Sequence, residues 1–241
     1  LHDQTGKLIR TREENFDLKK LLKDYAIGKK EFFSFKTSEG VDLNGWMIKP
    51  SNFDPNKKYP VLMTQYSGPN SQQVLDQWSI GWNDYLAQEG FVVACVDPRG
   101  TGARGEEFRK MTYQQLGKYE SDDQVEAARY LGTLSFVDKN SIAIWGWSYG
   151  GFMAALCMEK GADVFKAGIS VAPVTNWRFY DSVYTERYMR TPKENPDGYD
   201  DNSPLSHAEK IKDNYLIIHG SADDNVHFQN TMEFTERMVQ A

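Results

Sequence analysis

Most of the chain after residue 59 alternates short apolar runs with longer amphipathic segments. The apolar runs have the length and composition of buried strands, and they cover residues 60–64, 91–96, 141–145, 165–171 and 215–219. The amphipathic segments predict helices over residues 77–88, 121–131, 153–160 and 228–239. Strands that alternate with helices predict a mostly parallel, doubly wound α/β sheet.

The first part of the chain has a different pattern. Residues 1–30 are charged and poorly periodic, which predicts a connecting segment and not the start of a compact domain. Residues 31–36 and 41–48 alternate apolar and polar positions on either side of a polar turn, which predicts a β-hairpin. Residues 31–241 are therefore interpreted as one α/β domain with a hairpin at its start.

The predicted strand at 141–145 and the helix after it enclose the pattern Gly146-Trp147-Ser148-Tyr149-Gly150. A Gly-x-Ser-x-Gly sequence between a strand and a helix is the nucleophile elbow of α/β-hydrolases. The glycines let strand and helix approach closely, and the N-terminus of the helix favours developing negative charge. Ser148 is therefore the candidate nucleophile. The alternative is a glycine-rich turn with an incidental serine.

In an α/β-hydrolase an acid and then a histidine follow the serine along the chain. The last predicted strand is followed by Asp223 and Asp224, either of which is placed to orient a catalytic histidine. Two aspartates at this position are also typical of a cap for the next helix. Because the two aspartates follow Ser148 in the order that an α/β-hydrolase requires, the catalytic interpretation is favoured.

None of the four histidines has the expected position of the catalytic base. His2 and His207 precede the acid, His219 ends a strand and is expected to pack behind the acid loop, and His227 begins a helix. A catalytic histidine lies on its own loop after a further strand. We therefore expect it beyond Ala241, in a longer protein of which this chain is a piece.

Two groups are candidates for the oxyanion hole, which stabilises the negative charge of a tetrahedral intermediate. One is the backbone N–H of Tyr149, directly after the nucleophile. The second donor comes from the loop after the first strand of the parallel sheet, where the phenol of Tyr66 could supply it. A tyrosine that only packs at a strand end is the alternative.

An aromatic cluster, Val174–Tyr188, follows the strand at 165–171, on the side of the sheet where α/β enzymes bind ligands. Tyr180 and Tyr184 share one face if the segment is helical. A wall of tyrosine and tryptophan suits a compact apolar ring such as proline. Ordinary core aromatics are the competing explanation.

Composition and charge narrow the classes of function. The net charge of −6 gives no electrostatic argument for binding nucleic acid or an anionic membrane. No apolar stretch approaches the length needed to span a bilayer. Cys95 and Cys157 lie in apolar segments without metal-ligand spacing, so the sequence predicts no disulfide framework, no metal and no cofactor.

Four blocks together resemble the prolyl oligopeptidase family of serine peptidases, in particular the catalytic domain of its dipeptidyl peptidases. The blocks are Tyr66-Ser-Gly-Pro69, Gly146-Trp-Ser-Tyr-Gly-Gly151, Tyr180–Tyr188 and His219–His227. The resemblance implies Ser148 as nucleophile, Asp223 as acid, and Tyr66 with the Tyr149 amide as oxyanion donors. It also implies that Asn225 binds a substrate carbonyl. The pocket for the proline ring would be formed by Val174, Trp177, Tyr180, Tyr184 and Val226.

The resemblance further implies that the chain consists of two parts. Residues 1–30 correspond to the exit segment of a β-propeller outside the chain, and residues 31–241 to an α/β-hydrolase domain truncated before its last strand and helix. Without its histidine this fragment is expected to have little peptidase activity. The parent protein is expected to be periplasmic, secreted or membrane-anchored, and to release dipeptides with proline or alanine in second position from free N-termini. Family members often form homodimers.

Two other interpretations are weighed. A related acylaminoacyl peptidase, oligopeptidase or esterase would share the elbow, but the tyrosine pair and the Asn225-Val226-His227 sequence argue against it. A non-catalytic α/β-hydrolase used as a binding module would not need the serine elbow or the two oxyanion candidates. The peptidase interpretation is therefore preferred.

Overall fold

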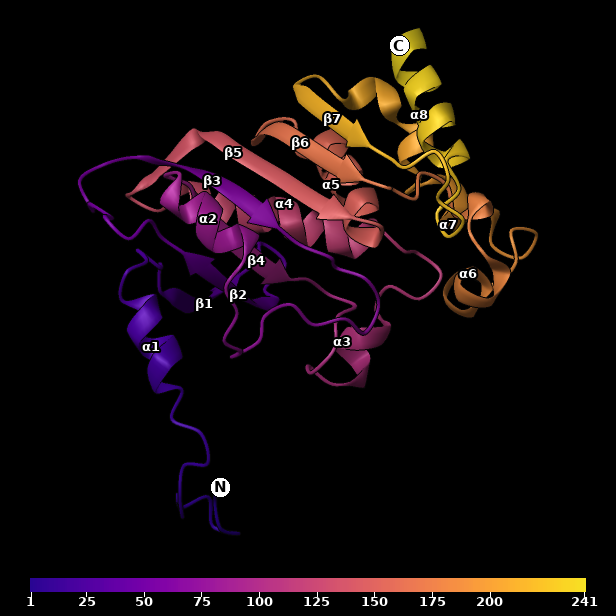
Figure 1. Cartoon of the computed structure of the whole chain (residues 1–241). Coiled ribbons are helices and arrows are strands. Elements are labelled where there is room, and N and C mark those ends of the chain that lie inside the picture. Colours follow the sequence, from indigo (N-terminus) through magenta and orange to yellow (C-terminus); the bar gives the residue numbers. More distant parts are fainter.

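The computed structural model describes residues 1–241, and its centre is a seven-stranded sheet in the order β1-β2-β4-β3-β5-β6-β7 (Figure 1). The strands are β1 Lys30–Lys36, β2 Asp42–Ile48, β3 Tyr59–Thr64, β4 Val92–Asp97, β5 Val137–Trp147, β6 Phe165–Val171 and β7 Asn214–Ile218. β2 pairs antiparallel with β1 and with β4, and all other pairs are parallel. The mostly parallel sheet and the hairpin predicted from the sequence are confirmed.

Helices cover both faces of this sheet. They are α1 Phe16–Leu22, α2 Trp82–Gln88, α3 Glu106–Lys110, α4 Lys118–Gly132, α5 Tyr149–Lys160, α6 Ser182–Met189, α7 Pro196–Asp200 and α8 Gln229–Gln240, with 3-10 turns η1 Trp177–Phe179, η2 Pro204–Ser206 and η3 Ala208–Lys210. α4 and α5 pack on one face over the main core, and Ala87 of α2 joins a smaller core on the other. β4 is buried along its whole length for this reason.

The predicted helix over 77–88 is wrong in its first five residues, because α2 begins only at Trp82. The amide of Gly81 donates to the buried carboxylate of Asp84, which fixes the start of the helix at this glycine. Trp78 and Ile80 are 66% and 42% exposed, so the apolar residues before Gly81 do not face the core. Their spacing imitates a helix without the packing that stabilises one.

Residues 1–30 lie at the edge of the structure. α1 has no buried residue, Phe16 is exposed, and the segment extends away from the sheet toward the N-terminus (Figure 1).

None of the helices combines the length and apolar character needed to cross a bilayer.

Candidate active site

The nucleophile candidate lies on a tight turn between β5 and α5. Ser148 has φ 59° and ψ −117°, in the left-handed half of backbone space that side chains rarely occupy. Its amide donates to the carbonyl of Val171 at the end of β6, at 2.8 Å. The strand–turn–helix context that the sequence predicts is therefore present, and the strained residue is the serine.

The glycines around Ser148 are required by close backbone approach. A Cβ on Gly150 would lie 2.6 Å from the carbonyl oxygen of Gln65, and one on Gly146 would collide with the carbonyl of Gly150. Because these obstacles are backbone atoms, they cannot move aside as a flexible side chain could. The glycines thus bring the end of β3 against the elbow.

The two tyrosines of the candidate oxyanion hole have neighbouring rings. The amide of Tyr149 belongs to the first turn of α5, where backbone donors have no acceptor within the helix. The Tyr149 ring is buried 5.9 Å from the ring of Tyr66, centroid to centroid. Burial raises the pKa of the half-buried Tyr66 phenol above its ordinary value, so it stays protonated and able to donate.

The acid loop after β7 distinguishes the two aspartates. Oδ1 of Asp223 accepts the amides of Asn225 and Val226, both at 3.0 Å, while Asp224 is exposed. α8 follows Phe228 and has no side-chain cap, so the alternative that the aspartates cap this helix is wrong. The second carboxylate oxygen of Asp223, Oδ2, accepts neither of these amides, and the side chain is 25% exposed.

His219 packs behind this loop, as the sequence suggested. Its Nε2 lies 2.8 Å from the carbonyl of Val226, which only an N–H can satisfy, and its Nδ1 then accepts from the Thr231 hydroxyl at 2.6 Å. Nε2 is 3.5 Å from Oδ2 of Asp223. With both nitrogens engaged and its side chain 1% exposed, His219 supports the acid loop from below.

The aromatic cluster joins the acid loop. The Tyr184 ring stacks on Trp177 at 5.9 Å and meets the Tyr180 ring edge-on at 5.4 Å. Tyr180 precedes α6 and is not part of it, so the two tyrosines do not share a helix face; Asp181 caps α6 between them. The Tyr180 hydroxyl donates to Oδ1 of Asn225 at 3.0 Å, across 45 residues of sequence.

The remaining pocket candidates are buried in the main core. Val174 and Val226 are each 2% exposed and belong to the same core cluster as Trp177. The six predicted pocket residues therefore come from two segments, the stretch after β6 and the loop after β7, that the fold brings together.

A residue that the sequence analysis did not single out lies under the elbow. Glu120, in the first turn of α4, is fully buried and accepts the Tyr149 hydroxyl at 2.7 Å and the Gly117 amide at 3.1 Å. Burial raises its pKa to about 7, against the opposing effect of these hydrogen bonds. The sequence signal was only Gly117 followed by a glutamate at the third helical position.

Replacing Glu120 by glutamine is expected to change how stability depends on pH. Between pH 4.5 and 7 the folded state holds a proton that the unfolded chain has lost, so stability present below pH 4.5 is lost as pH rises through 7. This shift corresponds to up to about 3 kcal/mol. The free energy of unfolding, measured with urea at pH 5 and at pH 8, should fall between these pH values in the unmodified protein and not in Glu120→Gln. An equal fall in the two proteins would contradict the prediction.

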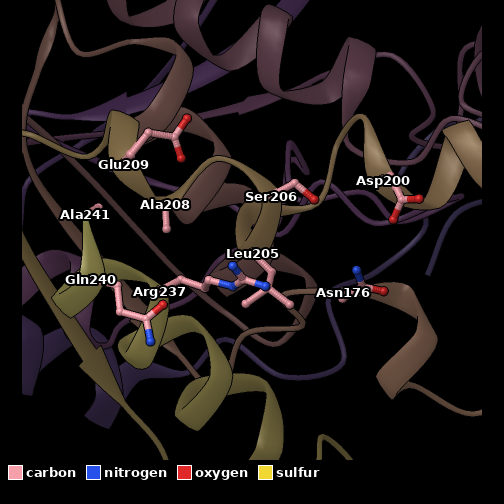
Figure 2. Close-up of a pocket in the computed structure, with 9 residues that line it drawn as sticks. All are labelled: Asn176, Asp200, Leu205, Ser206, Ala208, Glu209, Arg237, Gln240 and Ala241. Atoms are coloured by element: carbon pink, nitrogen blue, oxygen red, sulfur yellow. The ribbon is translucent and has the colours of Figure 1, made fainter.

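Two of the hollows in the surface are lined by residues outside the elbow and outside the loop of Asp223. One of about 720 Å³ is lined by Pro69, Asn70, Arg109, Lys110, Thr112, Tyr113, Arg187 and Tyr188. Figure 2 shows the other, of about 550 Å³, between Arg237 and Gln240 of α8 and the 3-10 turns around Leu205 and Glu209. Neither contains Ser148 or Asp223. No group of three or more His, Cys, Asp or Glu side chains is arranged to hold a metal ion.

Residues 78–241 match the model of the prolyl oligopeptidase family. Dipeptidyl aminopeptidase B of Saccharomyces cerevisiae is 46% identical over 241 residues, which cover 96% of this chain and 30% of that protein. Prolyl endopeptidase FAP of Homo sapiens is 43% identical over 246 residues, which cover 100% of this chain and 32% of that protein.

The crystal structure of Porphyromonas gingivalis dipeptidyl peptidase 4 matches with a TM-score of 0.93 and 59% sequence identity, over 99% of this chain and 34% of that one. The chain thus spans about a third of the length of these relatives. The fold and the family resemblance inferred from the four sequence blocks are confirmed. Since the family model covers more than half of the chain, this chain belongs to the prolyl oligopeptidase family of serine peptidases.

Proposed function

We propose that the chain is the catalytic part of a dipeptidyl peptidase that releases Xaa-Pro or Xaa-Ala dipeptides from peptide N-termini. The observation that carries the proposal is the Tyr180–Asn225 hydrogen bond, which joins the aromatic wall to the loop of Asp223. The reaction class is supported by the names of two relatives, dipeptidyl aminopeptidase B and dipeptidyl peptidase 4.

The proposed chemistry is acyl transfer through Ser148. Its Oγ attacks the scissile carbonyl while a histidine removes its proton, and the oxyanion accepts hydrogen bonds from the Tyr149 amide and the Tyr66 phenol. The amine then leaves with that proton, and water hydrolyses the acyl-enzyme. Oδ2 of Asp223 orients the histidine, since Oδ1 already accepts two amides.

We place the catalytic histidine outside residues 1–241. His219 is held by both ring nitrogens, His207 faces the Asp201 carbonyl and Lys210, and His227 is exposed on the acid loop. Without this base the isolated chain should turn over substrate slowly or not at all, because loss of one triad member lowers kcat by about 10⁴- to 10⁶-fold.

The substrate's proline ring is proposed to lie against Tyr180 and Tyr184, with Trp177, Val174 and Val226 behind them. Asn225 donates to a substrate carbonyl through its amide NH₂, because its Oδ1 already accepts the Tyr180 hydroxyl. An apolar pocket with one fixed polar group suits a small ring in one orientation.

Residues 31–241 are proposed as the catalytic domain, and residues 1–30 as the segment through which a β-propeller connects to it. The exposure of α1 and of Phe16 supports a contact outside this chain. Relatives about three times as long have room for such a domain.

The test is hydrolysis of Gly-Pro-nitroanilide by this chain and by the full-length protein, with N-acetyl-Gly-Pro-nitroanilide in parallel. Activity of the full-length protein alone, on the free amine only, supports the proposal. Equal cleavage of the acetylated substrate would replace it with an endopeptidase. No activity in either protein would favour the non-catalytic binding module, and activity of the chain alone would overturn the external histidine.

Replacing Tyr66 by phenylalanine in the full-length protein is expected to lower kcat by about 10²- to 10³-fold, because one oxyanion donor is removed. The ring that packs beside Tyr149 is retained, so the thermal midpoint of unfolding should change little. Steady-state kinetics with Gly-Pro-nitroanilide measure the effect. Tyr25→Phe, at an exposed tyrosine in the N-terminal segment, is the control. An unchanged kcat in Tyr66→Phe would leave this tyrosine as a packing residue only.

A further inference from the structure

We propose that α4 is the support that fixes both oxyanion-hole donors, through two buried hydrogen-bond chains that start at Glu120 and Gln124. The inference rests on the proposed function, since it assigns positioning residues to the oxyanion hole of that reaction. Neither residue is proposed to touch the substrate. Each acts through a donor residue or through the loop that carries it.

The first chain holds Tyr149. Its hydroxyl donates to Oε1 of Glu120 at 2.7 Å, and the other carboxylate oxygen accepts the Gly117 amide at the start of α4. Glu120 and Tyr149 are 0% and 2% exposed, so water does not compete for this bond. Because the Tyr149 side chain is anchored at its far end, the rotation of the first turn of α5, and with it the direction of the Tyr149 amide, is restricted.

The second chain holds the loop of Tyr66. Nε2 of Gln124 donates to the Ser67 hydroxyl at 3.1 Å, which donates to Oε1 of Gln65 at 2.9 Å. Nε2 of Gln65 then donates to the Gly150 carbonyl in the elbow, at 2.8 Å. Tyr66 is therefore flanked on both sides by residues whose side chains are tied down.

The backbone beside Tyr66 needs this support. Ser67 has φ 65°, in the left-handed region that costs energy for any residue except glycine. Its side chain is 1% exposed, and both Gln65 and Gln124 hold its hydroxyl. A strained residue persists where its surroundings fix it, and here the strain lies directly after the proposed donor.

α4 itself is locked against α5. A Cβ on Gly117 would lie 2.5 Å from the Phe152 ring and 2.6 Å from Leu156, so the start of α4 touches the helix that carries Tyr149. The two donors come from segments far apart in sequence, and side chains of α4 bond to Tyr149 and to Ser67, the residue after Tyr66. An oxyanion hole works through donors fixed before the charge develops, and an error of about 1 Å in position can cost about 10²-fold in rate.

The test compares Glu120→Gln and Gln124→Met with Ser121→Ala in the full-length protein. Ser121 is also buried on α4, but its hydroxyl bonds only to carbonyls of the same helix turn. In Glu120→Gln an NH₂ group replaces one of the two oxygens that accept the tyrosine hydroxyl and the Gly117 amide, so one of these two hydrogen bonds is lost or reversed. Methionine at 124 fills the space without a donor. We expect kcat for Gly-Pro-nitroanilide to fall about 10- to 100-fold in the first two variants, with KM nearly unchanged.

A second readout separates positioning from stability. A prolyl boronic acid, which becomes tetrahedral on Ser148, should bind the two variants more weakly by the same factor as kcat falls, while the dipeptide product Gly-Pro should inhibit all proteins equally. The inference would be overturned if Glu120→Gln and Gln124→Met lost as much thermal stability as the control Ser121→Ala but kept the kcat and the boronate affinity of the unmodified protein. An unmodified full-length protein with no activity would instead overturn the proposed function.

Discussion

Alanine in place of Ser148 is expected to lower kcat of the full-length protein for Gly-Pro-nitroanilide by about 10⁴- to 10⁶-fold. The hydroxyl is the only side-chain group of this residue that the proposed reaction uses, and the other hydroxyl on the elbow, that of Tyr149, is buried and bonded to Glu120. The smaller side chain also keeps the left-handed backbone of the turn, so the fold should survive. Single-turnover release of nitroaniline, measured beside far-UV circular dichroism, checks both expectations.

The control is Ser51→Ala, in the exposed turn before β3, which should leave kcat unchanged. If Ser148→Ala retained more than about a hundredth of the activity, acyl transfer through this serine would be contradicted, because triad nucleophiles contribute far more than that. The control excludes a general effect of losing a hydroxyl.

Asparagine in place of Asp223 should lower kcat by about 10⁴-fold, as loss of the triad acid does elsewhere. The remaining carbonyl oxygen of asparagine can still accept the amides of Asn225 and Val226, so the loop is expected to keep its shape. The NH₂ group that replaces Oδ2 cannot accept the N–H of the catalytic histidine. The variant thus removes the orienting acceptor and little else.

The neighbouring residue supplies the matched control for this prediction. Asp224 is exposed and makes none of these contacts, so Asp224→Asn should retain nearly full kcat. Steady-state kinetics of both variants on Gly-Pro-nitroanilide decide between the two aspartates. A larger loss in Asp224→Asn than in Asp223→Asn would reverse the assignment of the acid.

The sequence determined the sheet and the elbow, because both depend on local patterns. A buried strand needs a short apolar run, which is why the predicted residues 165–171 match β6 in both bounds. The elbow needs glycine on either side of Ser148, since backbone atoms occupy the space of a Cβ. The physical reason for each of these patterns lies in the residues of the pattern itself, so the pattern can be recognised from the sequence before the fold is known.

The pattern misled where packing decides the outcome. The apolar residues before Gly81 have helical spacing, but they are exposed, and a helix of this length depends on burying one face. The order of residues also left Asp223 and Asp224 as alternatives, and within the sequence only the family resemblance favoured Asp223. Only the folded loop shows Asp223 holding two amides while Asp224 is exposed.

Contacts between distant segments belonged to the tertiary structure alone. Tyr180 meets Asn225 across 45 residues and Glu120 meets Tyr149 across 29, and neither pair has a local signature. An acidic residue in a first helical turn is expected on the surface, where it interacts favourably with the helix dipole. That Glu120 is instead buried under the elbow follows from the packing of α4 on α5, because a carboxylate's surroundings are set by which elements the fold brings together.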